Sequence, residues 1–530
     1  MIPVSDGTRS ALTVAAGGLG LGVLAEILFH GALPGVNVIL WVLAAAGLIG
    51  WWSRRAATPL DRQVRLLAVP ALFFASVPAW RDAPSAVMLS LLMLGLTAAA
   101  AVAAAQGGRL AAVDLLEFVL RLLAATVSVV GGPLRLLAGD AAWGELSRGE
   151  TRRTAAAVAR GLVLALPVLL IFGMLFASAD PVFAELLGRA LNLHLSGAAV
   201  RLLYVLLWAW PAAGLLRALT RPERREVPMP PPDIGRPVGI VEGATVLGAV
   251  NALFLTFVLV QVRYLFGGAA LVQETVGLTY AEYARRGFFE LTLAAALVVP
   301  LLVAVDGLVP RREPRHQRLL RGLVLALVAQ VYVTLASAVY RMILYQQAYG
   351  LTELRLVVMF FLGWLAFVLA WLAFTMLAGR RERFVAGALV AGYVAAAALA
   401  AANPHGLVAR ANLDHYAATG RFDAVYNAEL GGDAVPALVQ ALPELSEEER
   451  TVVAGILLHR WGWLRPEAAS WRSWNLARQR AAAAVAAHRL ELAEAARPRG
   501  GAPRARPPPP PPQSEPDCRA KPPPRRHAGG

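Results

Sequence analysis

The chain has 530 residues, of which 57% are hydrophobic and only 16% are charged. Ordinary soluble proteins have about 25% charged residues, so this composition excludes a conventional soluble globular protein. The formal net charge is +15, but the arginines lie in short loops between apolar runs and in the C-terminal tail, which argues against nucleic-acid binding. The single cysteine, Cys518, excludes an intramolecular disulfide and a cysteine-based zinc or iron–sulfur site.

Long apolar runs indicate an all-α integral membrane protein with about eleven transmembrane helices. Each run has about 20 residues, which as a helix would cross the ~30 Å hydrocarbon core of a bilayer. The lipid bilayer is therefore the first expected partner. The expected spans are 11–29, 33–52, 64–80, 85–105, 158–177, 198–219, 240–262, 288–305, 322–345, 356–377 and 384–401.

The segment 110–130 is apolar but carries Asp114, Glu117 and Arg121 at helical spacing. We interpret it as an amphipathic or re-entrant helix on the inner face of the membrane. With the N-terminus in the cytoplasm, the inner loops then hold far more arginines than the outer loops, as the positive-inside rule requires. If 110–130 crossed the membrane, every later loop would change sides and this bias would be inverted.

This topology divides the chain into consecutive parts, and it places residues after about 402 outside the cytoplasm. The module at 403–496 is soluble in composition, and Ser446 is expected to cap a helix that runs to Trp461. The expected parts are 1–109 with the first four spans, 110–157 on the inner face, 158–402 with the other seven spans, the helical module 403–496 and a disordered Pro/Arg-rich tail 497–530.

Two polar residues inside spans are candidates for a functional role. Gly18 and Gly22 form a GxxxG pair that permits close helix packing, and Glu26 lies on the same face one turn later. Glu26 is either a functional intramembrane carboxylate or a side chain that reaches water at the helix end. Asn251 lies in the middle of the span 240–262, where an interhelical hydrogen bond would explain it.

The connection between the spans 240–262 and 288–305 is rich in arginine and tyrosine. A capping box at Thr279–Glu282 predicts a helix start there. One interpretation is an interfacial anchor made of aromatic side chains. The other is a site for an anionic headgroup or substrate, with arginines as donors. The candidate residues of this Arg/Tyr cluster are Arg263, Tyr264, Tyr280, Tyr283, Arg285, Arg286, Tyr340 and Arg341.

Three sequence segments resemble a known family. They are GLTYAEYARRGFFEL at 277–291, FASADPVFAELL at 176–187 and WRSWNLARQRA at 471–481. Together they resemble the DUF4153/DUF4173 family of bacterial membrane proteins, over roughly residues 150–490. The resemblance implies a multi-pass protein of the bacterial cytoplasmic (inner) membrane and carries over no catalytic residue.

The sequence contains no P-loop, HExxH, GxSxG or EF-hand pattern. We therefore expect no cofactor and no metal site, and nothing indicates an enzyme. Two classes of function remain. One is a transporter or a handler of lipids or envelope precursors that binds an anionic group at its outer face. The other is a non-catalytic scaffold or sensor whose C-terminal module recruits an envelope protein of unknown identity.

Overall fold

The structure is a computed structural model of the chain. It describes residues 6–55, 59–108, 113–136, 175–186, 197–223, 239–276, 288–309, 314–462 and 470–497, with the backbone alone in 262–276 and scattered helical residues between 154 and 173. The expected span 158–177 is described only in part. The expected capping box at Thr279 lies outside the described residues, and of the expected tail only Arg497 is described.

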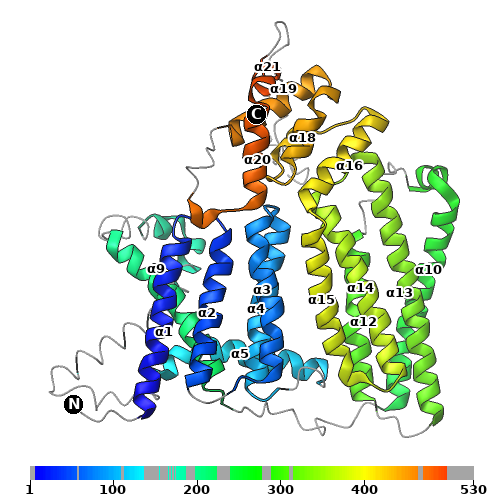
Figure 1. Ribbon diagram of the computed structural model, residues 1–530. Coiled ribbons are helices and arrows are strands. Elements are labelled where there is room, and N and C mark those ends of the chain that lie inside the picture. The colour runs from blue at the N-terminus through cyan, green and yellow to red at the C-terminus, as the bar shows by residue number, and fades with distance from the viewer. Residues whose placement is uncertain are drawn as a thin grey trace, which may run out of the picture.

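The regular secondary structure of the described residues is all helical, and the long helices stand side by side as a bundle (Figure 1). Within the described residues, eleven helices are long and apolar enough to cross a membrane, so the chain is an all-α polytopic membrane protein. The bundle helices are α1 (Asp6–Phe29), α2 (Val36–Arg55), α3 (Arg62–Trp80), α4 (Pro84–Ala105), α5 (Leu115–Arg135), α9 (Gly197–Thr220), α10 (Ile240–Val276), α12 (Phe288–Leu308), α13 (Pro314–Tyr349), α14 (Glu353–Leu377) and α15 (Phe384–Ala401).

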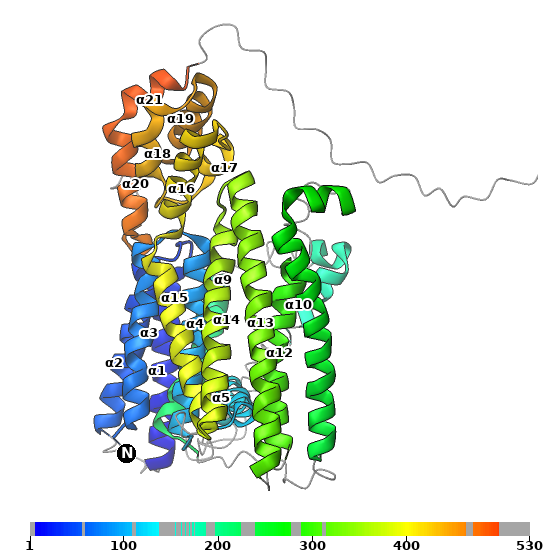
Figure 2. The same ribbon diagram turned by 90° about the vertical axis from the view of Figure 1, so that its right-hand side faces the viewer.

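All but one of these eleven helices overlap spans expected from the sequence; the exception is α5. Figures 1 and 2 show α5 lying across the bundle, nearly perpendicular to its neighbours, close to the end where α2 ends. Its length and composition would allow it to span, but this orientation is that of a helix lying along a membrane surface.

Helix α10 differs from the expectation. The sequence predicts a connection after residue 262, whereas the helix continues to Val276. The two glycines at 267 and 268 do not end it, because the flanking residues are good helix formers and no proline follows.

The contact between α1 and α9 depends on glycines, as the GxxxG pair predicts. A Cβ atom on Gly18 would lie 2.5 Å from Ala213 Cβ, and one on Gly22 would lie 2.5 Å from the Val205 carbonyl oxygen. Only glycine allows the two backbones to approach so closely. The predicted close packing of this face is confirmed.

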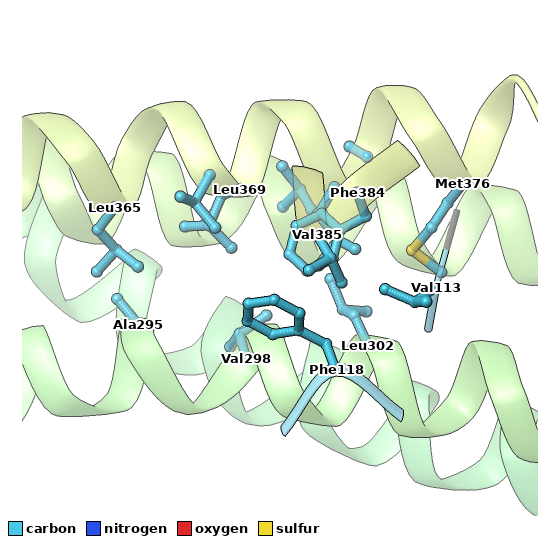
Figure 3. Close-up of a cluster of buried hydrophobic side chains, with 14 of the residues drawn as sticks. Val113, Phe118, Ala295, Val298, Leu302, Leu365, Leu369, Met376, Phe384 and Val385 are labelled. Carbon is cyan, nitrogen blue, oxygen red and sulfur yellow. The ribbon is translucent and has the colours of Figure 1, made fainter. Parts of the chain in front are cut away.

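The centre of the bundle is an apolar core shared by α3–α5 and α9–α15. Figure 3 shows Phe118 of the crosswise helix α5 beside Val298 and Leu302 of α12, facing Phe384 and Val385 of α15. Phe118 is buried, so α5 is packed into the bundle as well as lying across it.

The C-terminal helices form a compact module on the end of the bundle opposite α5 (Figures 1 and 2). The core of the module includes Leu356 of α14 and Leu399 of α15, so the two parts share one apolar interior. The capping box predicted at Ser446 and Glu449 is present. The helices are α16 (Pro404–Thr419), α17 (Ala424–Glu429), α18 (Val435–Ala441), α19 (Glu447–Trp461), α20 (Leu476–Ala487) and α21 (Arg489–Ala495), with short 3₁₀ turns η3 (Leu442–Glu444) and η4 (Trp471–Ser473). A further 3₁₀ turn, η2 (Arg381–Arg383), lies between α14 and α15 in the bundle.

The glycine contact between α1 and α9 gives a first prediction. Gly22→Ala should destabilise the protein by about 1–3 kcal/mol, because the added methyl group overpacks a tight contact. Gly20→Ala is the matched control on the same helix, since a Cβ atom there meets nothing within 4 Å. Thermal unfolding in detergent would measure both variants, and equal midpoints for the two would contradict the packing.

Candidate functional site at the junction of bundle and module

The predicted Arg/Tyr cluster is described only in part. Arg263 and Tyr264 lie within α10, where the structure gives the backbone alone, and Tyr340 and Arg341 lie on α13. The side chain of Tyr340 is exposed on the bundle surface. The remaining members, Tyr280, Tyr283, Arg285 and Arg286, lie outside the described residues. The cluster stays a prediction.

Two ion pairs attach the module to the α3–α4 loop, and we call them the junction ion pairs. The loop supplies the cation of one pair and the anion of the other. Arg81 of the loop pairs with Asp433 of the module at 3.0 Å, and the next loop residue, Asp82, pairs with Arg478 of α20 at 2.7 Å. The exposed fractions of these side chains are 13% for Arg81, 5% for Asp433, 13% for Asp82 and 21% for Arg478. Partly buried pairs of this kind are screened less by salt than surface pairs.

Backbone groups satisfy the rest of the junction. The Asp433 carboxylate also accepts a hydrogen bond from the Asp82 amide at 3.0 Å, and the Asp82 carboxylate accepts one from the Gly432 amide at 3.0 Å. Arg81 Nε donates to the Ala400 carbonyl at the end of α15, at 2.7 Å. Each charged group therefore has several partners, which is the condition under which a partly buried ion pair is stabilising.

The segment Trp471–Asn475 fastens the module to the first helical hairpin. The Val36 amide donates to the Trp474 carbonyl at 3.0 Å, and the Leu33 amide donates to the Ser473 hydroxyl at 3.0 Å. A Cβ atom on Gly35 would lie 2.6 Å from the Trp474 carbonyl oxygen, so the backbones meet without room for a side chain. Asn475 Nδ2 donates to the carbonyls of Pro78 and Arg81.

A polar contact between Glu353 and His405 links the module to α14. Glu353 Oε2 lies 2.9 Å from His405 Nε2, and its other carboxylate oxygen accepts a hydrogen bond from the Ser85 amide at 2.8 Å. His405 Nδ1 accepts a hydrogen bond from the Gly431 amide at 2.7 Å. A nitrogen that accepts carries no proton, so the imidazole proton lies on Nε2, facing the carboxylate.

A separate, partly open cavity of about 880 Å³ lies between the α13–α14 turn and the module. Pockets that bind small molecules have volumes of ~300–1,000 Å³. The walls are both aromatic and charged. The lining includes Tyr349, Arg355, His415, Arg421, Phe422, Asp423, Tyr426, Glu448 and Glu449.

The wall on the bundle side is held in place by the turn before α14. Gly350 has a φ of 73°, and Asn412 of α16 bonds to both the amide and the carbonyl of Leu351, at 2.7 and 2.9 Å. Arg355 donates to the Gly350 carbonyl and lies over the Tyr345 ring at 3.9 Å from its centroid. The guanidinium of Arg355 is thus fixed at the cavity wall.

The facing wall carries charges of both signs. Asp423 caps α17 through the Tyr426 amide, and Glu449 belongs to the capping box of α19. Arg421 and Glu448 are exposed, so both are accessible to a ligand. Burial raises the pKa of the Tyr426 hydroxyl, which accepts a hydrogen bond from the Glu353 amide at 2.9 Å. The cavity can therefore bind a polar group that carries charge.

The two intramembrane candidates lie in different places. Glu26 pairs with Arg201 of α9 at 3.7 Å. Asn251 Nδ2 donates to the Leu323 carbonyl of α13 at 3.1 Å, and Gln330 donates to Asn251 Oδ1 at 3.3 Å. The interhelical hydrogen bond predicted for Asn251 is therefore present.

Sequence reasoning missed the junction ion pairs and the cavity. Arg81 and Asp82 look like ordinary loop residues, and their partners are 352 and 396 positions away. The sequence did contain a signal for the start of α14, which borders the cavity. Thr352 is a typical capping residue, and its hydroxyl accepts a hydrogen bond from the Arg355 amide at 3.4 Å. His405, His415 and Asp414 are the nearest approach to a metal cluster in the sequence, and the described residues contain no group of three metal-binding side chains.

The junction ion pairs give a second prediction. A double-mutant cycle with Asp82→Asn and Arg478→Gln should yield a coupling free energy of about 1–3 kcal/mol, because the two charges share one partly buried contact. Chemical denaturation in detergent would measure it. A cycle of Asp82→Asn with Arg489→Gln on the exposed face of α21 is the control, and it should give almost no coupling. A negligible value for Asp82 and Arg478 would contradict the contact.

Comparison with known proteins gives a family. No curated protein and no solved structure matches the chain significantly. The model of a family described as a domain of unknown function, DUF4153, matches residues 68–441. The match begins earlier than the segments that first suggested the resemblance, and it ends before Trp471. It includes Arg81, Asp82, Glu353, His405 and Asp433. The match covers more than half of the chain, and the protein therefore belongs to the DUF4153 family.

Proposed function

We propose that this membrane protein binds the charged headgroup of a lipid or lipid-linked envelope precursor in the cavity between the α13–α14 turn and the module. The observation that carries the proposal is the cavity itself, with a fixed guanidinium at Arg355 and an exposed one at Arg421. An anionic group would bind these donors. The carboxylates of Asp423 and Glu448 would bind amino or hydroxyl groups of the same ligand.

The position of the cavity favours an amphiphilic ligand. It lies at the ends of α13 and α14, where Tyr349 and Leu354 are exposed. Tyrosine at a helix end is typical of the membrane–water interface. A lipid could thus keep its chains in the bilayer while its headgroup enters the cavity. A transporter or a carrier of envelope precursors would need such a site.

The proposed location is the bacterial cytoplasmic membrane, with the N-terminus in the cytoplasm and the module outside. The C-terminal ends of α2, α9 and α14 lie at the bundle end opposite the module (Figure 1), and arginines occur at or just after these ends, namely Arg54, Arg55, Arg217 and Arg380. This asymmetry supports a cytoplasmic position for that end. The cavity would then face the envelope.

A scaffold or sensor is the second candidate. Apolar side chains exposed on the module favour it, among them Val425, Trp474 and Leu490. Leu490 lies on α21, away from the lining of the cavity, and is 86% exposed. Leu490→Ser should weaken recruitment of a protein partner in cells and leave headgroup binding unchanged. The headgroup proposal instead expects that substitutions in the cavity weaken ligand binding and that substitutions on α21 do not.

Substitution of Arg421 tests the headgroup proposal. Arg421→Gln should weaken binding of short-chain phosphatidylglycerol about tenfold, because one charge-assisted hydrogen bond is lost. Calorimetric titration of the purified protein would measure the affinity. Arg489→Gln removes an equally exposed arginine far from the cavity and should bind like the unmodified chain. Equal affinity of the two variants, or no binding to any of these proteins, would refute the proposal.

A further inference from the structure

A second cavity lies on the membrane-facing side of the bundle, along the seam between α14 and α15. Its volume is about 1280 Å³. The lining is apolar over most of its length, and Phe367, Val390 and Val394 are exposed there, at 51%, 59% and 62%. We call it the α14–α15 groove. Its exposed apolar walls face the region that hydrocarbon would fill.

Small residues make the groove hollow. A Cβ atom on Gly363 would meet nothing within 4 Å, so this position borders open space. At Gly387 a Cβ atom would lie 2.0 Å from Trp371 Nε1. The indole of Trp371 can therefore lie against α15, where it donates to the Phe384 carbonyl at 3.2 Å. The ring forms a wall near one end of the groove.

The groove has the length of one leaflet. Its lining on α14 runs from Met359 to Trp371, which at 1.5 Å per residue is about 18 Å. The hydrocarbon core is about 30 Å thick, so one leaflet contributes about 15 Å. An acyl chain that entered at one end would fill the groove and stop near the middle of the membrane.

The end beside Trp371 is polar and carries a positive excess. Glu382 and Arg383 line it, and Arg380 and Arg383 are exposed. The neighbouring Arg381 pairs with Asp306 at 3.2 Å. The segment 380–383 beside this end, together with Asp306, therefore carries three arginines and two carboxylates. This distribution is complementary to an amphiphile with an apolar chain and an anionic head.

We propose that the α14–α15 groove binds an anionic phospholipid from the leaflet at the arginine-rich end of the bundle. Its acyl chain lies along Gly363 and Phe367, and its phosphate binds Arg380 and Arg383. Guanidinium groups bind phosphate through paired hydrogen bonds. They bind a headgroup less strongly when that headgroup carries no net negative charge. This site is at the opposite end of the bundle from the headgroup cavity and does not rest on the function proposed for it.

Two variants test the proposal with the full chain. Gly363→Leu places a bulky side chain in the groove at a position where a Cβ atom meets nothing within 4 Å. Arg380→Gln with Arg383→Gln removes the charge and leaves intact the backbone carbonyl of Arg383 that accepts from Trp371. The matched controls are Gly47→Leu, at an open glycine on α2, and Arg54→Gln with Arg55→Gln at the end of α2.

Native mass spectrometry would count the lipids retained after exchange into nanodiscs of equal phosphatidylglycerol and phosphatidylethanolamine. The unmodified protein and both controls should retain phosphatidylglycerol preferentially. Gly363→Leu should lose the retained lipid, and the double arginine variant should lose the preference about tenfold. Retention that survives Gly363→Leu would overturn the groove as the site. An unchanged preference in the double arginine variant, or an equal loss in the Arg54/Arg55 control, would overturn the anionic ligand.

Discussion

The junction ion pairs fasten the C-terminal module to the first four helices of the bundle. The module continues directly from α15 and is therefore joined covalently to the later helices. It reaches the first four helices only by folding back over them. Arg81 and Asp82 each meet an opposite charge on the module there. The loop and the module each supply one cation and one anion, so neither side of the contact carries a net charge. Removing one member would leave a partly buried charge without a partner, which is costly.

The module also contacts the bundle at two further places. The module is held against the α1–α2 loop through Ser473 and Trp474, and against α14 through His405 and Glu353. Elsewhere along the same boundary, the α13–α14 turn forms one wall of the headgroup cavity, and α16, α17 and α19 form the other. The cavity therefore lies between the bundle and the module and takes residues from both. The α14–α15 groove, in contrast, depends only on small residues along two adjacent helices.

The sequence was sufficient for the features that depend on local pattern. Apolar run length predicted the spans, because a helix in lipid must satisfy its backbone internally and needs a minimum length. Gly18, Gly22, Ser446 and Asn251 were interpreted correctly because GxxxG packing, capping and interhelical hydrogen bonds have short-range signatures.

Features that depend on distant contacts could not be predicted in the same way. Nothing near Asp82 in the sequence indicates Arg478, and nothing near Glu353 indicates His405. The crosswise helix α5 shows that a local pattern can also mislead. Its apolar length alone is that of a span. The charged residues Asp114, Glu117 and Arg121 and, above all, the arrangement of arginines along the whole chain favoured a surface helix. The extension of α10 to Val276 was missed because paired glycines weaken a helix without always ending it.

The most direct test of this account is the distance between the module and the first helical hairpin. Spin labels would be introduced at Leu33 and Val425, both exposed, after Cys518→Ser. The distance between the labels would be measured by pulsed electron–electron double resonance. We expect one narrow distance distribution, which broadens when Asp82→Asn and Asp433→Asn are combined. A broad distribution in the parent protein, or a narrow one that the double variant leaves unchanged, would contradict the role of the junction ion pairs.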